Sequence, residues 1–231
     1  MILAGIQKNS LIDYPGKVAC VVFVAGCNFA CPYCHNPDLA LGRYPERISV
    51  DELIRFLQPR RLLLDGVVIT GGEPTLTPML AELCRAIRNL GLEIKLDTNG
   101  SRPDVLAQLM EERLVDYIAM DLKTAIEGYA PVLVADAVKP LIVQSIKLIK
   151  TGRVDYEFRT TCVRPFVDEQ LIVPMAQAIE GARRYVLQPF RKALLLQPDF
   201  FGQANPSIPP RELKQLQTLA APWVQQCLIR S

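Results

Sequence analysis

The stretch GVVITGGEPTLTPMLAELCRAIRNLGLEIKLDTNG, residues 66–100, decides the fold class. It opens with a short apolar run at 66–70, continues through a helical pattern at 77–90 and closes with a second apolar run at 92–97. Short continuous apolar runs are typical of strands buried on both faces. A helix between two such runs is typical of parallel strands joined by a right-handed crossover. The stretch therefore predicts a strand–helix–strand unit of an α/β protein.

The same alternation continues on both sides of this stretch. Buried strands are also predicted at residues 18–24, 115–121, 154–161 and 184–188. Further helices are predicted at residues 50–57, 103–114, 137–150 and 168–180, with a last one near Pro210 because proline suits the first position of a helix. A complete eight-unit barrel typically needs about 250 residues. Six units therefore predict a partial barrel or an open α/β sheet, and of these we expect an α/β fold of the partial (β/α)6 TIM-like barrel type.

The composition is that of a single folded domain. Half of the 231 residues are hydrophobic and 22% are charged, a balance typical of globular proteins. A chain of this length fits one domain with a substantial core. We expect a single domain over residues 1–231, with a short N-terminal hairpin at 1–16, a core at about 17–190 and a C-terminal extension at 191–231. Pro15 and Gly16 are expected to form the turn of the hairpin.

Charge and hydropathy exclude several classes of partner. The net charge of +2 gives no broad basic surface, so neither nucleic acid nor a membrane is expected as the main partner. Apolar runs such as VACVVFVAG are about half the length needed to span a bilayer. No basic segment and no small-residue cleavage pattern follow Met1, so no signal peptide is predicted and the expected location is the cytoplasm. In that compartment, clustered cysteines indicate metal or redox chemistry rather than structural disulfides.

Polar residues follow, or end, each of the six predicted parallel strands. In chain order they are Cys27, then Gly71-Gly72-Glu73, Asp97-Thr98-Asn99-Gly100, Asp121 with Lys123, Arg159 and Gln188. The carboxyl ends of parallel strands meet at one edge of the sheet, where such folds build their active sites. The sequence therefore predicts one site that gathers these residues.

Three cysteines, Cys27, Cys31 and Cys34, fall within eight positions. A structural zinc site would need a second cysteine pair, and a thioredoxin-like pair would leave Cys27 unexplained. An electron-carrier cluster would need a fourth thiolate. The nearest candidate, Cys20, lies mid-strand, about 23 Å from Cys27 if the chain is extended. These considerations favour a [4Fe–4S] cluster with three cysteine ligands and one open iron, and they leave packing roles for the scattered cysteines Cys20, Cys84, Cys162 and Cys227.

The spacing Cys-x3-Cys-x2-Cys, with an aromatic residue before the last cysteine, resembles the radical S-adenosylmethionine (radical SAM) superfamily. GGEPTL at residues 71–76 resembles the segment of that family that holds the methionine amino group. NSLIDYPGKVACVVFVAGCNFACPYCHNPDL resembles the amino-terminal region of glycyl-radical-enzyme activases, most closely the activating protein of anaerobic ribonucleoside-triphosphate reductase. DTNG and MDLK also resemble segments of these activases, and the resemblance covers residues 5–190. The chain lacks the cysteine-rich insertion of some activases, so a single cluster is expected.

The resemblance implies how the two cofactors would be held. It makes Cys27, Cys31 and Cys34 the metal ligands, and it places the backbone at Tyr33 against the adenine. Gly71, Gly72 and Glu73 would hold the amino group of S-adenosylmethionine, with Glu73 as the side-chain candidate. From the residues alone, the glycines could simply form a turn and Glu73 could be an acid in the first turn of a helix.

The polar ends of the next strands are further candidates: the resemblance bears on Asp97 and Thr98, and the chemistry and position of the residues bear on Asp121, Lys123 and Arg159, the last of which could also extend to solvent. Asp97 and Thr98 would lie near a monovalent cation beside S-adenosylmethionine, or they could merely cap or turn the chain. Asp121 and Lys123 share a face if the strand is still extended, and they would bind the cofactor or form an ion pair. Arg159 would meet the methionine carboxylate, because a guanidinium is well matched to a carboxylate.

The activity implied is that of an activase acting on a partner protein. The cluster, reduced by a flavodoxin- or ferredoxin-type donor, would cleave S-adenosylmethionine to a 5′-deoxyadenosyl radical, which would take a hydrogen from a glycine Cα of a glycyl-radical enzyme such as anaerobic ribonucleotide reductase. Asp13 would contact the substrate peptide, although it could be only a turn residue. No catalytic side chain is expected, because the cofactors carry the chemistry. Two alternatives stay open: a radical SAM enzyme acting on another peptide or a small metabolite, and a non-enzymatic iron–sulfur electron carrier.

Overall fold

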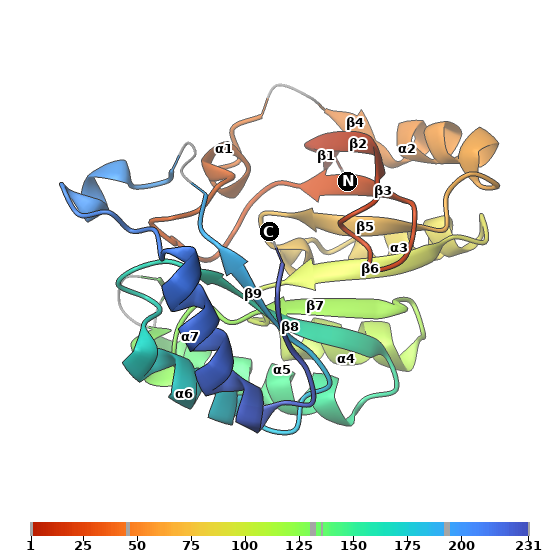
Figure 1. The fold of residues 1–231 in the computed structure, drawn as a ribbon. Coiled ribbons are helices and arrows are strands. Elements are labelled where there is room, and N and C mark those ends of the chain that lie inside the picture. The colour runs from red at the N-terminus through yellow and green to blue at the C-terminus, as the bar shows by residue number, and fades with distance from the viewer. Residues whose placement is uncertain (1, 45–46, 130–132, 135, 192–194, 231) are drawn as a thin grey trace.

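A curved eight-stranded sheet forms the centre of the computed structural model (Figure 1), which describes residues 2–44, 47–129, 133–134, 136–191 and 195–230. The strand order is β10-β9-β8-β7-β6-β5-β3-β2. Six neighbouring strands run parallel: β3 (Ala19–Val24), β5 (Gly66–Gly71), β6 (Glu93–Thr98), β7 (Tyr117–Asp121), β8 (Asp155–Cys162) and β9 (Tyr185–Pro189). They confirm the six predicted strands. Because the sheet ends at β2 and β10, the barrel is partial, as the sequence predicts.

The connections between the parallel strands contain helices, and α4, α5, α6 and α7 lie together against one side of the sheet (Figure 1). The helices are α1 (Pro37–Ala40), α2 (Val50–Leu57), α3 (Leu80–Arg88), α4 (Pro103–Glu111), α5 (Lys139–Thr151), α6 (Glu169–Ala178) and α7 (Pro210–Ala220). Short 3₁₀ turns lie at Gln58–Arg60, Pro74–Leu76, Ile126–Tyr129, Asp136–Val138, Pro198–Phe201 and Ala221–Trp223. In the described part of the chain, none of these helices is long and apolar enough to cross a membrane.

The N-terminal segment joins the main sheet. β2 (Gly5–Ser10) pairs antiparallel with β3, and the turn that follows is closed by a hydrogen bond from the Lys17 N–H to the Tyr14 carbonyl at 3.1 Å. Gly16 has φ +74°, the left-handed conformation that the third residue of a type II turn requires. The predicted turn at Pro15-Gly16 is thus confirmed. Separately, β1 (Ile2–Leu3) pairs with β4 (Ile48–Ser49).

The two faces of the parallel sheet have different chemistry. On the outer face, alternate side chains such as Val22, Ile69 and Phe158 pack with the helices in the main core. The inner face carries a small apolar cluster that includes Tyr14 and Val68. Charged side chains occupy the rest of the inner face toward the carboxyl ends of the central strands: Lys95, Asp97, Asp121, Glu157 and Arg159. The fold therefore directs its polar residues into the mouth of the open barrel.

Candidate active site

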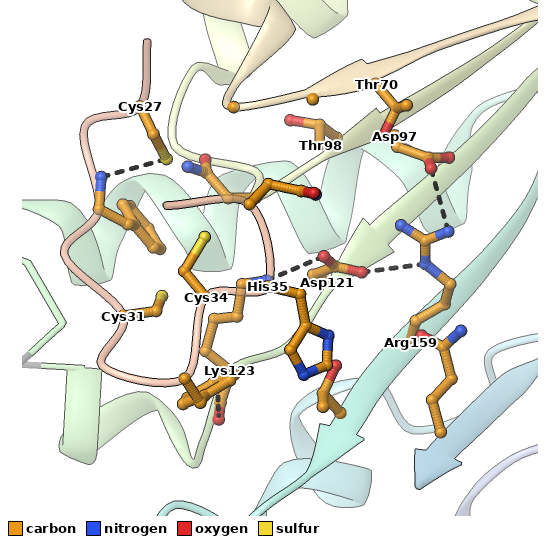
Figure 2. A pocket seen from close by; sticks show the side chains of 18 of the residues that line it. Cys27, Cys31, Cys34, His35, Thr70, Asp97, Thr98, Asp121, Lys123 and Arg159 are labelled. Carbon is orange, nitrogen blue, oxygen red and sulfur yellow. Dashed lines mark hydrogen bonds and ion pairs between the residues drawn. The ribbon is translucent and has the colours of Figure 1, made fainter. Parts of the chain in front are cut away.

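A cavity of about 420 Å³ opens at the carboxyl ends of the parallel strands (Figure 2). All the predicted site residues except Glu73 line it: Asp13, Cys27, Cys31, Tyr33, Cys34, Gly71, Gly72, Asp97, Thr98, Asp121, Lys123 and Arg159. Gln188 and His35 also line it. Five strands, the loop between β2 and β3 and the loop after β3 thus bring together residues that lie up to 175 positions apart, from Asp13 to Gln188.

The three cysteines lie on the loop that follows β3, and Figure 2 shows their side chains around the space that this loop encloses. The loop is shaped by a hydrogen bond from the Cys34 N–H to the Cys31 carbonyl at 3.0 Å. Burial raises the pKa of the Cys31 thiol to about 12, although the nearby Lys123 opposes this shift. A thiolate is therefore unfavourable there unless a strongly positive partner binds it, as iron does.

The geometry of the thiols suits a cluster better than a single ion. The described residues contain no group of three or more His, Cys, Asp or Glu side chains that could hold one metal ion. In a multi-iron cluster, each cysteine binds a different iron, so the sulfurs need not converge on one point. Three thiols around one cavity therefore fit as the protein ligands of a [4Fe–4S] cluster.

Gly71 and Gly72 hold the end of β5 against the start of the cysteine loop. The Gly72 N–H donates to the Val24 carbonyl and the Glu73 N–H donates to the Gly26 carbonyl, both at 2.8 Å. Gly71 has φ +120°, and a Cβ at either glycine would overlap backbone atoms of Val24 or Gly26. The glycine pair is thus required for close backbone approach as well as for the turn.

Glu73 has a different position from the one expected. Its side chain is 1% exposed and does not line the cavity. One carboxylate oxygen accepts from the Thr75 N–H at 3.1 Å, the Thr75 hydroxyl at 2.5 Å and the Thr98 hydroxyl at 2.7 Å, and the other accepts from the Asn99 N–H at 2.6 Å. Burial raises the pKa of Glu73, and these hydrogen bonds oppose the rise. The carboxylate clamps the loop after β5 to the end of β6 instead of pointing at a ligand.

A pair of side-chain amides, of which the sequence indicated only Asn99, extends this clamp to the cysteine loop. Asn99 Nδ2 donates to the side-chain oxygen Oδ1 of Asn28 at 3.0 Å, and Asn28 Nδ2 donates to the Ser101 hydroxyl at 2.9 Å. Asn28 directly follows Cys27, so the loop that carries the thiols is tied to the loops after β5 and β6. The position of Asn28 directly after a predicted cluster ligand was its signal in the sequence.

The clamp gives a stability prediction. Glu73→Ala removes the acceptor of four buried hydrogen bonds, so we expect the free energy of unfolding to fall by about 2–4 kcal/mol in urea titrations of the purified protein. Glu82→Ala, on the exposed side of α3, is the matched control and should change stability by no more than about 0.5 kcal/mol. Unchanged stability in Glu73→Ala would rule out the clamp.

A chain of alternating charges crosses the wall of the cavity (Figure 2). The Arg159 guanidinium bridges Asp97, with Nη1–Oδ2 at 3.2 Å, and Asp121, with Nε–Oδ1 at 2.9 Å. Lys123 Nζ lies 2.9 Å from Asp121 Oδ2, and Lys95 Nζ contacts Asp97 Oδ1. Burial alone would raise the pKa of Asp121, but Arg159 and Lys123 outweigh it and hold the pKa at about 2. We name these five residues the charge chain.

Aromatic side chains close the base and rim of the cavity. The buried Tyr33 ring packs against Phe166 at 5.1 Å between centroids, and its hydroxyl donates to the Lys123 carbonyl at 3.4 Å. The His35 ring stacks on Phe190 at 5.2 Å between ring centroids. Asp13 lies at the open rim, where its carboxylate accepts from the Ser10 hydroxyl at 2.5 Å. The site thus has an enclosed base and one accessible side.

An open barrel with three thiols on the loop after its first parallel strand is the architecture of an enzyme built around an iron–sulfur cluster. Residues 21–150 match the model of the radical SAM superfamily. The chain belongs to the radical SAM superfamily. Its cofactors are a [4Fe–4S] cluster and S-adenosylmethionine, and the interpretation as a non-enzymatic electron carrier is set aside.

Relatives of known name narrow the class. A Methanocaldococcus jannaschii protein named "Putative glycyl-radical enzyme activating enzyme MJ1227" is 32% identical over 235 residues, covering 100% of this chain and 96% of the relative. The pyruvate formate-lyase-activating enzyme of Staphylococcus aureus is 34% identical over 132 residues, covering 52% of each chain. The protein is therefore homologous to activating enzymes of glycyl-radical enzymes. Among solved structures, Streptococcus suis SuiB bound to S-adenosylmethionine shares the fold, with a TM-score of 0.67 at 13% identity over 91% of this chain and 52% of that chain.

Proposed function

We propose that the protein activates a glycyl-radical enzyme, and that this partner is of the anaerobic ribonucleotide reductase type. The observation that carries the proposal is the single cavity that joins the cysteine loop, the glycine backbone after β5 and the charge chain. Full-length similarity to an archaeal protein named as an activating enzyme supports the general activity. The choice of reductase rests on the sequence NSLIDYPGKVACVVFVAGCNFACPYCHNPDL alone.

In this proposal the protein binds and orients cofactors that carry the chemistry. When bound, the cluster and S-adenosylmethionine supply a reductive cleavage that gives a 5′-deoxyadenosyl radical. Cys27, Cys31 and Cys34 hold the cluster. The backbone at Gly71 and Gly72 lies against the cysteine loop and offers peptide groups to the methionine amino group. Glu73 acts indirectly, through its hold on the neighbouring loops.

The charge chain is suited to the methionine carboxylate. Its three cations and two carboxylates leave one net positive charge, which complements one carboxylate. Arg159 and Lys123 both line the cavity and are the groups that would meet it. The packed Tyr33 and Phe166 rings exclude water from the base, where a carbon radical must be protected.

The partner would approach from the accessible side. Asp13 lines both the main cavity and a neighbouring cavity of about 510 Å³ that reaches Pro189 and Arg230. An extended glycine loop of the partner could pass between the loop after β2 and the end of β9 to reach the main cavity. We further propose a flavodoxin- or ferredoxin-type protein as the electron donor and the reducing cytoplasm as the location.

The test is the formation of a radical in the partner. Mixed anaerobically with anaerobic ribonucleotide reductase, S-adenosylmethionine and reductant, the protein should produce a glycyl radical, seen by electron paramagnetic resonance as a doublet that collapses when the Cα hydrogen is replaced by deuterium. Asp13→Ala should lose the doublet but keep partner-independent formation of 5′-deoxyadenosine. Lys8→Ala, exposed on β2, is the matched control and should behave as the wild type.

Two outcomes bear on different parts of the proposal. Suppose that the protein cleaves S-adenosylmethionine and produces a glycyl radical in another glycyl-radical enzyme but not in this reductase. That result would correct only the choice of partner. Cofactor cleavage with no glycyl radical in any such enzyme would refute the activase function and favour a radical SAM enzyme with a different substrate.

A further inference from the structure

Lys95 is a buried cation beneath the cavity. It precedes Asp97 by two residues on β6, so both side chains lie on the inner face of the sheet. The Lys95 side chain is 1% exposed and does not line the cavity, and its ammonium contacts Asp97 Oδ1. Burying a charged side chain is costly unless it is well paired. A lysine in this position therefore needs a structural reason.

The carboxylates of the charge chain have no free oxygen. The two oxygens of Asp97 face Lys95 and Arg159, and the two oxygens of Asp121 face Arg159 and Lys123. All four oxygens thus already pair with cationic N–H groups. A diffusible metal ion at either carboxylate would share an oxygen with one of these cationic groups and would be repelled by its positive charge.

The Thr98 hydroxyl is also engaged. It donates to Glu73 at 2.7 Å and accepts from the Gly100 N–H at 3.1 Å. Asp97 and Thr98 are the residues at which a monovalent cation was expected from the sequence. Their side-chain oxygens do not fit such an ion in this protein, because every one of them has a protein partner.

A further buried charge on the inner face of the sheet is balanced separately. Glu157, on the same face of β8, is fully buried and accepts two hydrogen bonds from Arg230 at 2.8 Å and one from the Tyr117 hydroxyl at 3.1 Å. Glu157 and Arg230 therefore form a neutral pair. The single positive charge of the charge chain is left for the methionine carboxylate, and removing Lys95 would abolish it.

We propose that the Lys95 ammonium takes the place of a monovalent cation, so that the protein binds S-adenosylmethionine without one. The proposal rests on cofactor binding in this cavity, which is part of the proposed function, but not on the identity of any partner. Lys95 supplies a compact positive charge that fixes Asp97, and Asp97 in turn fixes Arg159. Because the charge is covalently attached, its occupancy does not depend on the ions in solution.

Burial and the neighbouring charges act in opposite directions on the charge of Lys95. Burial lowers the pKa of the Lys95 ammonium, and the adjacent Asp97 carboxylate opposes that shift. The groups that face Lys95 are Asp97, Arg159 and Glu157, so carboxylates outnumber the guanidinium.

The first experiment needs no variant. The affinity of the cluster-loaded wild-type protein for S-adenosylmethionine is measured by equilibrium dialysis in potassium, sodium or choline chloride at equal ionic strength. We expect the dissociation constant to agree among the three salts within about twofold, a difference of less than 0.5 kcal/mol. A wild-type affinity at least about tenfold weaker in choline than in potassium would overturn the proposal.

The second experiment creates the missing ion site. Lys95→Met keeps an unbranched side chain of similar length but removes the charge. In choline its affinity for S-adenosylmethionine should fall about 10–100-fold, and potassium or sodium should restore it to within about threefold of the wild type. Crystals of Lys95→Met soaked in rubidium should show anomalous scattering beside Asp97, and wild-type crystals should not.

Lys17→Met is the matched control, because Lys17 pairs with Glu93 at the opposite end of β6. It should show no dependence on the salt. The proposal fails if Lys95→Met loses affinity for S-adenosylmethionine and no monovalent cation restores it. It also fails if Lys95→Met keeps its full affinity for S-adenosylmethionine in choline. Should that variant not fold, the wild-type salt series and the rubidium-soaked wild-type crystals still decide. Because only cofactor binding and scattering are measured, the result does not depend on whether a glycyl radical is ever formed.

Discussion

Cys27→Ala, Cys31→Ala and Cys34→Ala are each expected to abolish the intact cluster and, with it, the cleavage of S-adenosylmethionine. The wild-type protein reconstituted anaerobically should bind about four irons and four sulfides per chain. Each variant removes one of three protein ligands from a cluster that already has an open iron, so no second cysteine can take over. Iron and sulfide analysis measures the first effect, and chromatography of 5′-deoxyadenosine measures the second.

Cys20→Ala and Cys84→Ala are the controls. Both thiols are fully buried in the main core, Cys20 on β3 and Cys84 on α3, and burial raises the pKa of each to about 12. We expect these variants to lose some stability by leaving a small cavity, but to keep the full iron content. Loss of the cluster from a folded Cys20→Ala protein would mean that the ligand set has been misassigned.

Much of the fold could be predicted because its central strands are buried on both faces. Continuous apolar runs such as GVVIT are easy to recognise as strands. Because the connections between parallel strands are almost always right-handed, few topologies then remain possible. The helix ends were less predictable. The helix expected at 77–90 begins only at Leu80, because Pro74–Leu76 forms a 3₁₀ turn first. β10 (Cys227–Ile229) was missed, because three residues parallel to β9 leave too short a pattern.

The site was predictable as a set of residues but not as a set of contacts. Its members could be found because parallel strands bring their carboxyl ends to one edge. The direction of the Glu73 carboxylate could not be predicted, because it depends on a hydrogen bond from the Asn99 N–H, which lies 26 positions away in the chain. The position of Lys95 on the inner face of the sheet could also have been predicted from the sequence. In EIKLDT, charges at 93, 95 and 97 alternate with apolar residues, which puts a row of charge on the inner face of β6.

Arg159→Met is expected to cause the largest loss of stability among single changes in the charge chain. The side chain of Arg159 is 14% exposed and is shared by Asp97 and Asp121, so its removal leaves two largely buried carboxylates without a common partner. Breaking a buried ion pair in this way costs about 3–5 kcal/mol. Urea unfolding measures the loss. Binding of S-adenosylmethionine should disappear as well, since Arg159 lines the cavity.

Arg183→Met, in the loop before β9, is the matched control, because Arg183 pairs with a residue of the strand that carries Arg159. Arg183 pairs with Asp155 at 2.9 Å, but the two side chains are 50% and 74% exposed. Solvent screens such a pair, so the change should cost less than about 1 kcal/mol. If both variants lost the same free energy of unfolding, burial would not explain how much the ion pairs of the charge chain stabilise the protein.

The pH dependence separates electrostatics from simple loss of packing. In the wild type the pKa of Asp121 is about 2, below its ordinary 3.8, so its contribution to stability is complete above pH 4 and is lost as the pH falls toward 2. Without Arg159, burial should raise the pKa of both carboxylates. A buried acid with a raised pKa destabilises the fold most when it is ionised, and protonation relieves it. The stability deficit of Arg159→Met should therefore narrow as the pH falls from about 7 to about 4. A deficit that stays constant over this range would assign the effect to lost packing of the arginine side chain instead of to its charge.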